Sequence, residues 1–382
     1  MKVLHLGKFY PPHKGGMEIH LQQLVVYQSN LMDVEAIVAN DKAHTHAERI
    51  DGSLITRVAS LGTFASMPLT PGLGGHLRRH SPDIIHLHTP NPGAAFALPA
   101  SLGRSKLVIT HHSDTLGRPL LRKLAAPFVQ HAMRIASRII VTSTNYRDTS
   151  EELALYRKKC VVIPLGIDPM RFGHADPTAV EQIQASYGPR IILAVGRLVP
   201  YKGFDYLVNS MKDVDATLLL VGNGPLKPSL QALVDGIGLQ GRVHLLDSVQ
   251  DASIPAFYQA ASIFVMPSIS RAEAFGIVQL EAMASGLPII NTAIPSGVPQ
   301  VSIHEQTGLT VPTSDSDALA TAMNRLLNQP ELRIRFGAAA KARVDKEFTV
   351  EQMARKTVQL YEQILAEDVH RVGAGLSPSR VD

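Results

Sequence analysis

Cysteine is nearly absent from this sequence. Cys160 is the only cysteine among 382 residues, so no disulfide bond can form within the chain. Disulfides persist in oxidising compartments, and a chain without them suits a reducing one, so we expect a cytoplasmic protein. Cys160 itself lies in the apolar segment CVVIP, where we expect a small, buried hydrophobic side chain.

Long apolar segments are missing as well. No stretch approaches the roughly 18 to 20 residues that a membrane-spanning helix requires. The N-terminal segment MKVLHLGKFYPP passes directly from a short apolar run to a proline turn. It shows neither the apolar centre nor the small-residue cleavage site of a signal peptide. We therefore expect neither a membrane span nor a cleaved leader.

Charge of one sign is not concentrated either. Lysine and arginine number 37 against 33 aspartates and glutamates, which gives a net charge of +4. This mild excess is compatible with an anionic substrate or with a membrane surface. It differs from the concentrated basic stripe of a nucleic-acid-binding protein, so we expect no nucleic-acid partner.

The sequence does contain abundant apolar material in short runs. Hydrophobic residues make up 45% of the chain, enough for the two domains that 382 residues favour. Continuous apolar runs alternate with amphipathic stretches, which is typical of buried parallel strands connected by helices. Because these strands are too many for one twisted sheet, we predict an α/β protein with two doubly wound, Rossmann-like domains. The runs are KVLHLG, EAIVA, DIIHLH, KLVITH, RIIVTS and CVVIP in the first half and RIILAVG, ATLLLVG, RVHLL, ASIFVMP and LPIINT in the second.

The division between the domains is expected after CVVIP. Gly166, Pro169 and Gly173 interrupt the pattern there, before a short polar helix and a new strand. We predict an N-terminal domain over residues 1–170 and a C-terminal domain over residues 171–366.

The last predicted helix begins after Thr349, where Gln352 completes a capping-box pattern. It carries one apolar face, which must pack on another element, and the N-terminal domain is the candidate. Residues 367–382 lack periodicity, and we expect them to form a flexible tail.

Candidate site residues follow the predicted strands, because ligands of open parallel sheets bind beyond the carboxyl ends of the strands. Gly15 and Gly16 follow the first strand and either let backbone N–H groups approach an anion or only form a tight turn. His111 and His112 follow KLVIT, where a histidine could hydrogen-bond a substrate. Most of the 16 histidines are nevertheless expected to be structural or solvated, and no spacing among them predicts a zinc site.

Two cations follow the first strand of the second domain. Arg197 and Lys202 lie in a loop closed by Gly203, where together they would stabilise a leaving diphosphate, although single loop lysines are commonly only solvated. Gly222 and Gly224 follow the next strand and form part of a dinucleotide fingerprint whose third glycine is missing. That spacing gives weak support to an NAD-dependent oxidoreductase.

The segment RAEAFGIVQLEAMASGLPI holds two glutamates eight positions apart. Its apolar residues predict a buried helix that begins around Ala274 to Ile277 and ends at Gly286. The free N–H groups at the start of that helix would bind an anion. Glu273 precedes the helix and Glu281 lies within it, and carboxylates of this kind accept hydrogen bonds from the hydroxyls of sugars.

Asp213-Val214-Asp215 forms a pattern that holds a divalent metal in some nucleotide-sugar enzymes. Here the pattern precedes a strand, at the amino end of the sheet and away from the expected ligand site. We interpret it as a turn between a helix and a strand and predict no catalytic metal.

Several motifs together resemble one known family. EAFGIVQLE matches an E-x7-E motif, and with GRLVPYKG, VGNGP, the early Gly-Gly loop and IPLGID it resembles the family 4 retaining glycosyltransferases of GT-B fold. The resemblance extends to about residue 366. It implies two Rossmann-like domains that face each other across a cleft. The second would bind a nucleotide diphosphate sugar, and the first would supply most of the acceptor site.

The resemblance also implies roles for individual residues. Arg197 and Lys202 would neutralise the diphosphate. Glu273 and His112 would contact the transferred sugar, and Glu281 would bind the ribose of the nucleotide. The other donor-binding positions that the resemblance implies are Gly15, Gly16, Gly196, Gly222, Ala274, Phe275, Gly276 and Ile277.

The reaction implied is sugar transfer to an acceptor hydroxyl with retention of configuration, without a metal or another cofactor. Retention could arise by double displacement through a carboxylate nucleophile or by attack on the same face, and we favour the latter. Similarity to bacterial polysaccharide and O-antigen transferases favours GDP-mannose as donor, with UDP-sugars as the alternative. A protein that binds the donor without catalysis is a further alternative.

Such enzymes extend saccharide or polyprenyl-diphosphate-linked acceptors at the cytoplasmic face of the inner membrane. Residues 117–138 mix apolar and basic side chains. They predict either an interfacial helix that contacts anionic lipid or a helix that faces the core with a solvated basic side.

Overall fold

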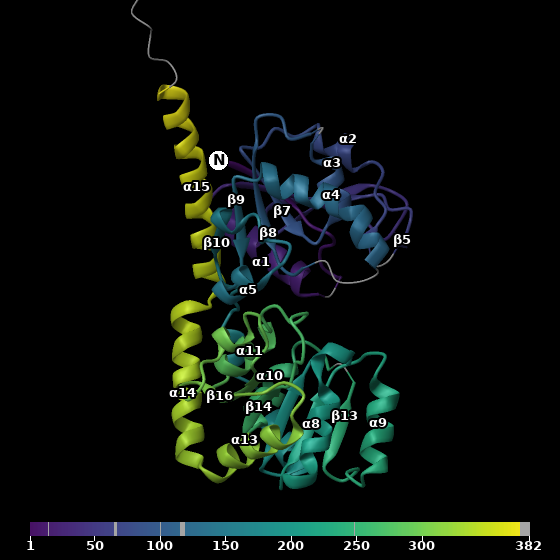
Figure 1. The fold of residues 1–382 in the computed structure, drawn as a ribbon, viewed down its shortest axis with the longest axis vertical. Coiled ribbons are helices and arrows are strands. Elements are labelled where there is room, and N and C mark those ends of the chain that lie inside the picture. The colour runs from purple at the N-terminus through teal and green to yellow at the C-terminus, as the bar shows by residue number, and fades with distance from the viewer. Residues whose placement is uncertain (14, 65–66, 100, 115–118, 248, 375–382) are drawn as a thin grey trace, which may run out of the picture. The chain divides into compact units, whose positions relative to one another are not determined.

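The computed structural model describes residues 1–13, 15–64, 67–99, 101–114, 119–247 and 249–374. The chain forms two compact units, drawn in Figure 1. Unit 2 contains residues 165–349, and unit 1 contains residues 1–164 together with the last helix, α15, which begins at Val350. The chain therefore enters unit 2 slightly before the expected boundary at residue 170, and α15 belongs to unit 1.

Unit 1 is built on an eight-stranded sheet with the order β10-β9-β8-β7-β1-β2-β4-β3. Neighbouring strands are parallel, except that β3 is antiparallel to β4. All six strands expected in the first half of the chain are present. The strands are β1 (Lys2–Leu6), β2 (Asp33–Ala39), β3 (His46–Ile50), β4 (Ser53–Val58), β7 (Ile84–Thr89), β8 (Lys106–His111), β9 (Arg138–Val141) and β10 (Cys160–Val162).

The hairpin of β3 and β4 was not expected. Its turn places Asp51 and Gly52 at φ 49° and 82°, and an Asp-Gly pair is a strong signal for a two-residue hairpin turn. The strand before this turn, HAERI, is largely exposed and has no apolar run, so a search for apolar runs misses it. A short two-stranded sheet of β5 (Thr63–Phe64) and β6 (Met67–Pro68) completes the strands described in unit 1.

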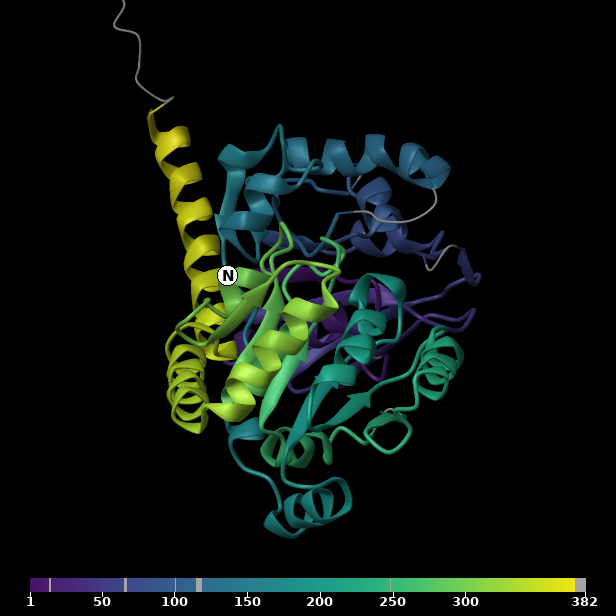
Figure 2. The same ribbon diagram turned by 60° about the horizontal axis from the view of Figure 1, so that its bottom comes forward.

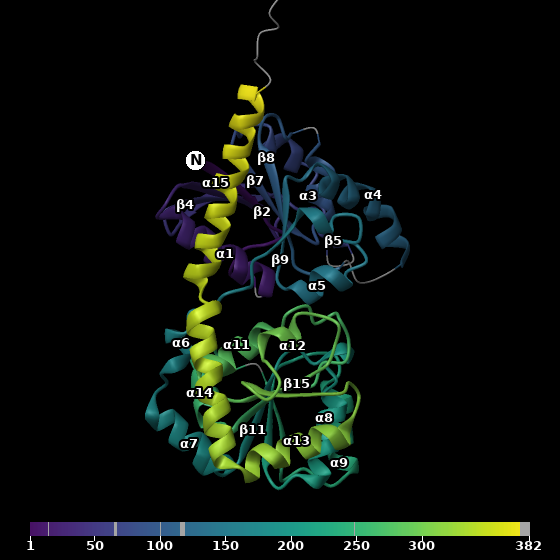
Figure 3. The ribbon, with the colours of Figure 1, turned by 60° about the vertical axis from the view of Figure 1, so that its left-hand side comes forward.

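Helices lie on both faces of the sheet of unit 1. Figure 3 shows α1 and α15 on one face and α3 and α4 on the other. α15 runs to Ala374, so the expected tail from residue 367 is helical over its first part, and residues 375–382 lie outside the described residues. The helices of this unit are α1 (Gly16–Ser29), α2 (Leu73–Leu77), α3 (Pro92–Ala97), α4 (Pro119–Ile135), α5 (Thr144–Thr149), η1 (Arg157–Lys159) and α15 (Val350–Ala374).

Unit 2 contains a six-stranded, wholly parallel sheet with the order β13-β12-β11-β14-β15-β16. Its strands run side by side in Figure 2, and they include one, β16, that was not expected. The five expected strands are all present. The strands are β11 (Ile191–Val195), β12 (Thr217–Val221), β13 (Val243–Leu246), β14 (Ile263–Met266), β15 (Ile289–Thr292) and β16 (Gly308–Val311).

Helices also cover both faces of the sheet of unit 2. Figure 3 shows α8, α9 and α13 on one side and α6, α7, α11 and α14 on the other. This doubly wound arrangement confirms the predicted fold class. The helices are α6 (Met170–Gly173), α7 (Pro177–Tyr187), η2 (Pro200–Lys202), α8 (Phe204–Ser210), η3 (Met211–Asp213), α9 (Lys227–Gly236), α10 (Ile254–Ala260), α11 (Ile277–Ala284), α12 (Val298–Val301), α13 (Ser316–Asn328) and α14 (Pro330–Glu347).

Cys160 is half-buried rather than buried as expected. It lies on β10, which is an edge strand of the sheet, so one side of the strand lacks a neighbour that would cover it. Burial still raises the pKa of the Cys160 thiol to about 11, which keeps it protonated and unreactive at neutral pH.

Candidate functional site

The loops after β11 and β12 pack against each other at the carboxyl ends of the sheet in unit 2. Gly196 N–H donates to the carbonyl of Val221 at 3.0 Å. A Cβ atom on Gly222, whose φ is +150°, would lie 2.0 Å from the carbonyl oxygen of Gly196. Gly222 of VGNGP is therefore required by the contact between the two loops. Binding of a dinucleotide is not needed to explain why a glycine occupies this position.

Lys202 and Glu273 form an ion pair at this edge of unit 2. Lys202 Nζ lies 2.5 Å from Glu273 Oε2, and the two side chains are only 9% and 13% exposed. Burial disfavours the charged ammonium, but the Glu273 carboxylate outweighs it and raises the pKa of Lys202. Ser268 Oγ donates a further hydrogen bond of 3.4 Å to the same carboxylate oxygen. The structure thus holds a charged lysine in a buried position at the end of β11.

Arg197 differs from Lys202 in its surroundings. Its side chain is exposed, and within the described ranges it makes no ion pair. The two cations that the sequence predicts as a clamp are therefore one buried ammonium, paired with Glu273, and one exposed guanidinium.

The turn before α11 presents unpaired backbone groups. The helix begins at Ile277, at the end of the expected range, and Gly276 precedes it in the left-handed conformation at φ +74°. This backbone conformation favours glycine, and a Cβ atom there would also lie 2.7 Å from the side chain of Met266. The backbone N–H groups of residues 275–278 donate to no atom in the part of the chain that the structure describes. Four free donors at a helix start are suited to binding an anion.

Glu281 lies one turn into α11 and accepts a hydrogen bond of 2.7 Å from the hydroxyl of Tyr258. Burial raises the pKa of the Glu281 carboxyl, and the hydrogen bond from Tyr258 partly opposes that rise. Its partner comes from α10, twenty-three residues earlier, and no sequence motif marks Tyr258. No sequence motif marks Ser268, the hydrogen-bond donor to Glu273, either.

Gly15 and Gly16 lie at the start of α1 in unit 1. Gly15 is the N-cap and has an extended backbone, which any residue can adopt. The space around Gly16 is open, since a Cβ atom there would meet nothing within 4 Å. This open space is compatible with a ligand that approaches the start of the helix. That Gly15 and Gly16 let an anion approach the backbone stays a prediction.

His112 follows β8 and belongs to a chain of buried side chains in unit 1. His112 Nε2 lies 3.3 Å from His88 Nδ1, and His88 Nε2 lies 3.1 Å from His5 Nδ1. His5 Nε2 in turn lies 2.8 Å from the amide oxygen of Gln28. Burial lowers the pKa of His112 to about 3 and that of His5 to about 4, so both rings are neutral at physiological pH.

Sequence reasoning identified His112 but not its partners. His5, His88 and Gln28 lie far from it in the chain, on β1, β7 and α1. His88 ends the run DIIHLH, whose alternation does not reveal which neighbour the ring will face. The parallel register of β1, β7 and β8 brings the rings together.

Among the residues that the structure describes, three groups of side chains lie close enough to share an ion. They are His5 with His86 and His88, His20 with His88 and His112, and His111 with Asp114 and Glu152. In the first two groups, ring nitrogens of His5, His88 and His112 already hydrogen-bond one another. These two histidine groups are compatible in chemistry with a borderline metal such as zinc, but the hydrogen-bonded chain accounts for their proximity without one.

The aspartates of Asp213-Val214-Asp215 are in none of these groups. Asp213 ends η3, and Asp215 is exposed and lies 3.8 Å from Arg190 at the amino end of β12. The interpretation as a turn between a helix and a strand is confirmed.

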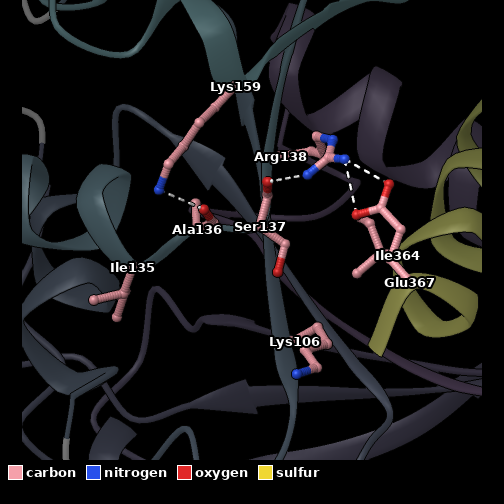
Figure 4. A pocket seen from close by; sticks show the side chains of 8 residues that line it. All are labelled: Lys106, Ile135, Ala136, Ser137, Arg138, Lys159, Ile364 and Glu367. Carbon is pink, nitrogen blue, oxygen red and sulfur yellow. Dashed lines mark hydrogen bonds and ion pairs between the residues drawn. The ribbon is translucent and has the colours of Figure 1, made fainter. Parts of the chain in front are cut away.

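A pocket of about 330 Å³ in unit 1, shown in Figure 4, is lined by Lys106, Arg138, Lys159 and Glu367 among others. Arg138 pairs with Glu367 at 2.7 Å, and Lys159 donates to the carbonyl of Ala136 at 2.9 Å. Lys106 begins β8, whereas His112 follows the other end of the same strand. This pocket is therefore at the amino ends of the strands and is not part of the candidate site.

Family models match both units. One described as Glycosyltransferase Family 4 matches residues 14–171, and one described as Glycosyl transferases group 1 matches residues 176–343. A similar solved structure is sucrose-phosphate synthase from Thermosynechococcus elongatus, with a TM-score of 0.78, 23% identity and coverage of 96% of this chain and 100% of that one. The matches define an enzyme of the glycosyltransferase class with the GT-B fold.

Curated relatives span nearly the whole chain. D-rhamnosyltransferase WbpZ of Pseudomonas aeruginosa is 31% identical over 91% of this chain and 92% of its own length. O-antigen chain mannosyltransferase C of Escherichia coli is 29% identical, with coverage of 96% and 99%. A GDP-mannose-dependent monoacylated α-(1-6)-phosphatidylinositol monomannoside mannosyltransferase of Corynebacterium glutamicum is 28% identical, with coverage of 94% and 97%. The chain belongs to glycosyltransferase family 4.

Proposed function

We propose that this glycosyltransferase moves a hexose from a nucleoside diphosphate to an acceptor hydroxyl and retains the anomeric configuration. The observation that carries the proposal is the charged, buried Lys202, paired with Glu273 only two residues before the free N–H groups of residues 275–278. A leaving diphosphate gains negative charge, and a fixed ammonium with aligned N–H donors stabilises that charge. The exposed Arg197 supplies the second cation.

The remaining roles follow the family pattern. Glu273 binds hydroxyls of the transferred sugar through the carboxylate oxygen that Lys202 leaves available. Glu281, oriented by Tyr258, binds the ribose. His112 contacts the transferred sugar, and Gly15 and Gly16 leave room for the phosphate.

The ion pair favours attack on the same face as the leaving group. A double displacement needs a carboxylate nucleophile that is free to form a covalent bond. Glu273 is instead paired through Oε2 with Lys202 at 2.5 Å and with Ser268 at 3.4 Å, and this pairing makes its carboxylate a weaker nucleophile. Orientation and stabilisation of the leaving group are what this arrangement supplies, and neither requires a metal or another cofactor.

GDP-mannose is the proposed donor, and UDP-sugars are the alternative. Two of the relatives described above are named mannosyltransferases, and one of these is named GDP-mannose-dependent. A third is named a rhamnosyltransferase, so the sugar varies among similar chains.

The proposed acceptor is a saccharide or a polyprenyl-diphosphate-linked saccharide of a bacterial surface polysaccharide, such as an O-antigen, at the cytoplasmic face of the inner membrane. The described part of the chain has no helix that is long and apolar enough to cross a membrane. The outer side of α4 exposes Lys123, Phe128 and Arg134, and Phe128 stacks edge-on against the exposed Phe96 with 4.9 Å between ring centroids. Exposed aromatic and basic side chains of this kind suit peripheral contact with anionic lipid.

A panel of GDP- and UDP-sugars, assayed with EDTA present, tests the proposed reaction. We expect transfer from GDP-mannose, an unchanged rate in EDTA, and an axial anomeric linkage that matches the donor by NMR. Loss of transfer in EDTA would contradict metal independence, and an inverted linkage would contradict retention. Donor binding without transfer to any saccharide acceptor would favour a binding protein.

Replacing Tyr258 by phenylalanine tests the role of Glu281. The variant leaves a buried carboxylate oxygen without its donor, which we expect to weaken binding of GDP by about tenfold, since a hydrogen bond to a charged group contributes roughly 1.5 to 3 kcal/mol. Calorimetric titration measures this affinity. Tyr187→Phe, in α7 of the same unit, is the matched control. Equal affinities in both variants would remove Glu281 from the ribose site.

A further inference from the structure

Four buried side chains of unit 1 form a continuous hydrogen-bonded chain that ends at His112. Gln28 comes from α1, His5 from β1 and His88 from β7, while His112 follows β8. The contacts along the chain measure 2.8, 3.1 and 3.3 Å. Because each neutral imidazole has one N–H donor and one acceptor nitrogen, each contact determines the next.

The direction of the chain is set at Gln28. Its amide oxygen can only accept, so His5 Nε2 carries the proton and donates to it. His5 is neutral, since burial lowers its pKa to about 4, and its Nδ1 is therefore an acceptor. His88 Nε2, 3.1 Å away, must then be the donor in the second contact.

The same reasoning reaches His112. His88 is neutral because burial lowers its pKa, so a ring that donates through Nε2 accepts through Nδ1. His112 Nε2 must donate to that nitrogen at 3.3 Å. The remaining nitrogen of His112, Nδ1, then carries a lone pair, and it makes no hydrogen bond to the described residues.

In this orientation the Gln28 amide is hydrogen-bonded through its oxygen, and its buried nitrogen has no partner within the described structure. The Gln28 side chain also lies against the hydroxyl of Tyr361. That hydroxyl lies 2.5 Å from His86 Nδ1. A reversed amide would reverse every contact in the chain and place a proton on His112 Nδ1, so the two orientations make opposite predictions.

We propose that Gln28, His5 and His88 are positioning residues that hold His112 as the Nε2–H tautomer, so that His112 Nδ1 accepts a hydrogen bond from a hydroxyl of the transferred sugar. The sugar contact rests on the function proposed above, whereas the tautomer does not. An imidazole in a mixture of tautomers would present an acceptor for only part of the time, and the correct tautomer is a prerequisite for binding the hydroxyl in one geometry.

Nuclear magnetic resonance of protein labelled with ¹⁵N-histidine tests the tautomer directly, because protonated and unprotonated ring nitrogens have well separated shifts. In the unmodified protein we expect His112 to be protonated at Nε2 only, with its signals assigned by their loss in His112→Ala. In Gln28→Met, which removes the acceptor at similar volume, we expect both tautomers in comparable amounts. A proton on Nδ1 in the unmodified protein, or an unchanged tautomer in Gln28→Met, would overturn the proposal.

His20→Phe is the matched control. His20 also lies on α1, its ring packs edge-on against His112 with 4.7 Å between centroids, and neither of its ring nitrogens has a hydrogen-bond partner within the described structure. The variant disturbs the packing around His112 without touching the chain, so we expect the Nε2–H tautomer to persist. Loss of that tautomer in His20→Phe would show that packing, and not the chain, selects it.

Kinetics then test the link to catalysis. We expect Gln28→Met to lower kcat about twofold, in proportion to the lost tautomer. In a His112→Ala background the same substitution should have no further effect, because Gln28 acts only through His112. If Gln28→Met lowers kcat by the same factor in the His112→Ala background as in the unmodified protein, the positioning role is contradicted. If no transfer is found with any donor, the proposed function fails, while the NMR result still decides the tautomer.

Discussion

Replacing Lys202 by methionine is expected to lower kcat for sugar transfer by about 10²- to 10³-fold, the effect of removing one group that stabilises charge in a transition state. The ammonium is held in a buried site by Glu273 at 2.5 Å, so no mobile side chain replaces it. Because the charge it neutralises develops as the diphosphate leaves, KM for the donor should change much less than kcat. Steady-state kinetics with the best donor of the panel measure both constants.

The same substitution should also destabilise unit 2. It leaves the Glu273 carboxylate buried without its partner, which costs about 3 to 5 kcal/mol in comparable cases. The double variant Lys202→Met/Glu273→Gln removes both charges, and we expect it to recover the free energy of unfolding but not the activity. Denaturant titration separates the two effects.

The matched control is Lys227→Met. Lys227 pairs with Asp247 at 2.6 Å in the same unit, but both side chains are more exposed, so the substitution should change neither kcat nor stability measurably. Near-normal kcat in Lys202→Met would remove Lys202 from the donor site. Recovery of activity in the double variant would show that the pair is only structural.

The free energy of unfolding is expected to fall steeply as the pH is lowered from 7 toward 5. Burial lowers the pKa of a cluster of histidines in unit 1, so these rings stay neutral in the folded state while they become protonated in the unfolded chain below pH 6.5. The unfolded state then binds more protons, and stability decreases by about 2 kcal/mol for each such ring between pH 7 and pH 5. The rings are His5, His20, His86, His88 and His112.

The free energy of unfolding continues to fall until the pH reaches the pKa values of the folded state, near 4 for His5 and 3 for His112. Glu281 acts in the opposite direction, since its raised pKa favours the folded state as the pH falls, but it is a single group. Denaturant titration at several pH values measures the slope.

His20→Phe again provides the control for this prediction. His20 makes no hydrogen bond through either ring nitrogen, so its replacement removes a titrating ring without breaking a bond in the described network. In this variant the decrease in the free energy of unfolding between pH 7 and pH 5 should be smaller by about 2 kcal/mol. Equal stability of the unmodified protein at the two pH values would show that the cluster is protonated in the fold.

The architecture could be predicted from local patterns. Continuous apolar runs such as RIILAVG are typical of buried parallel strands, and every predicted strand is present. The additional hairpin of β3 and β4 escaped because HAERI is exposed on its edge and carries no such run. Its Asp51-Gly52 turn was the one available signal.

Motifs that lie within a few residues of one another were equally accessible. The loop that carries Lys202 and the turn before α11 were both located by their position after a strand, because the carboxyl ends of parallel strands share one edge of a sheet. The buried ion pair between Lys202 and Glu273, and the cost of breaking it, could not be predicted. Seventy-one positions separate the partners, and nothing in the sequence shows that both are buried.

The sequence by itself determined the fold class, the family and the identity of the candidate donor-site residues, because strand burial and glycine-rich loops are encoded over short stretches of chain. Only the tertiary structure decided which side chains meet. The register of three parallel strands places His5, His88 and His112 in one chain, and the packing of α10 on its neighbours brings Tyr258 to Glu281. Hydrogen bonds and pKa values depend on distances of a few ångströms between residues that are remote in sequence, and those distances exist only after the sheets have assembled.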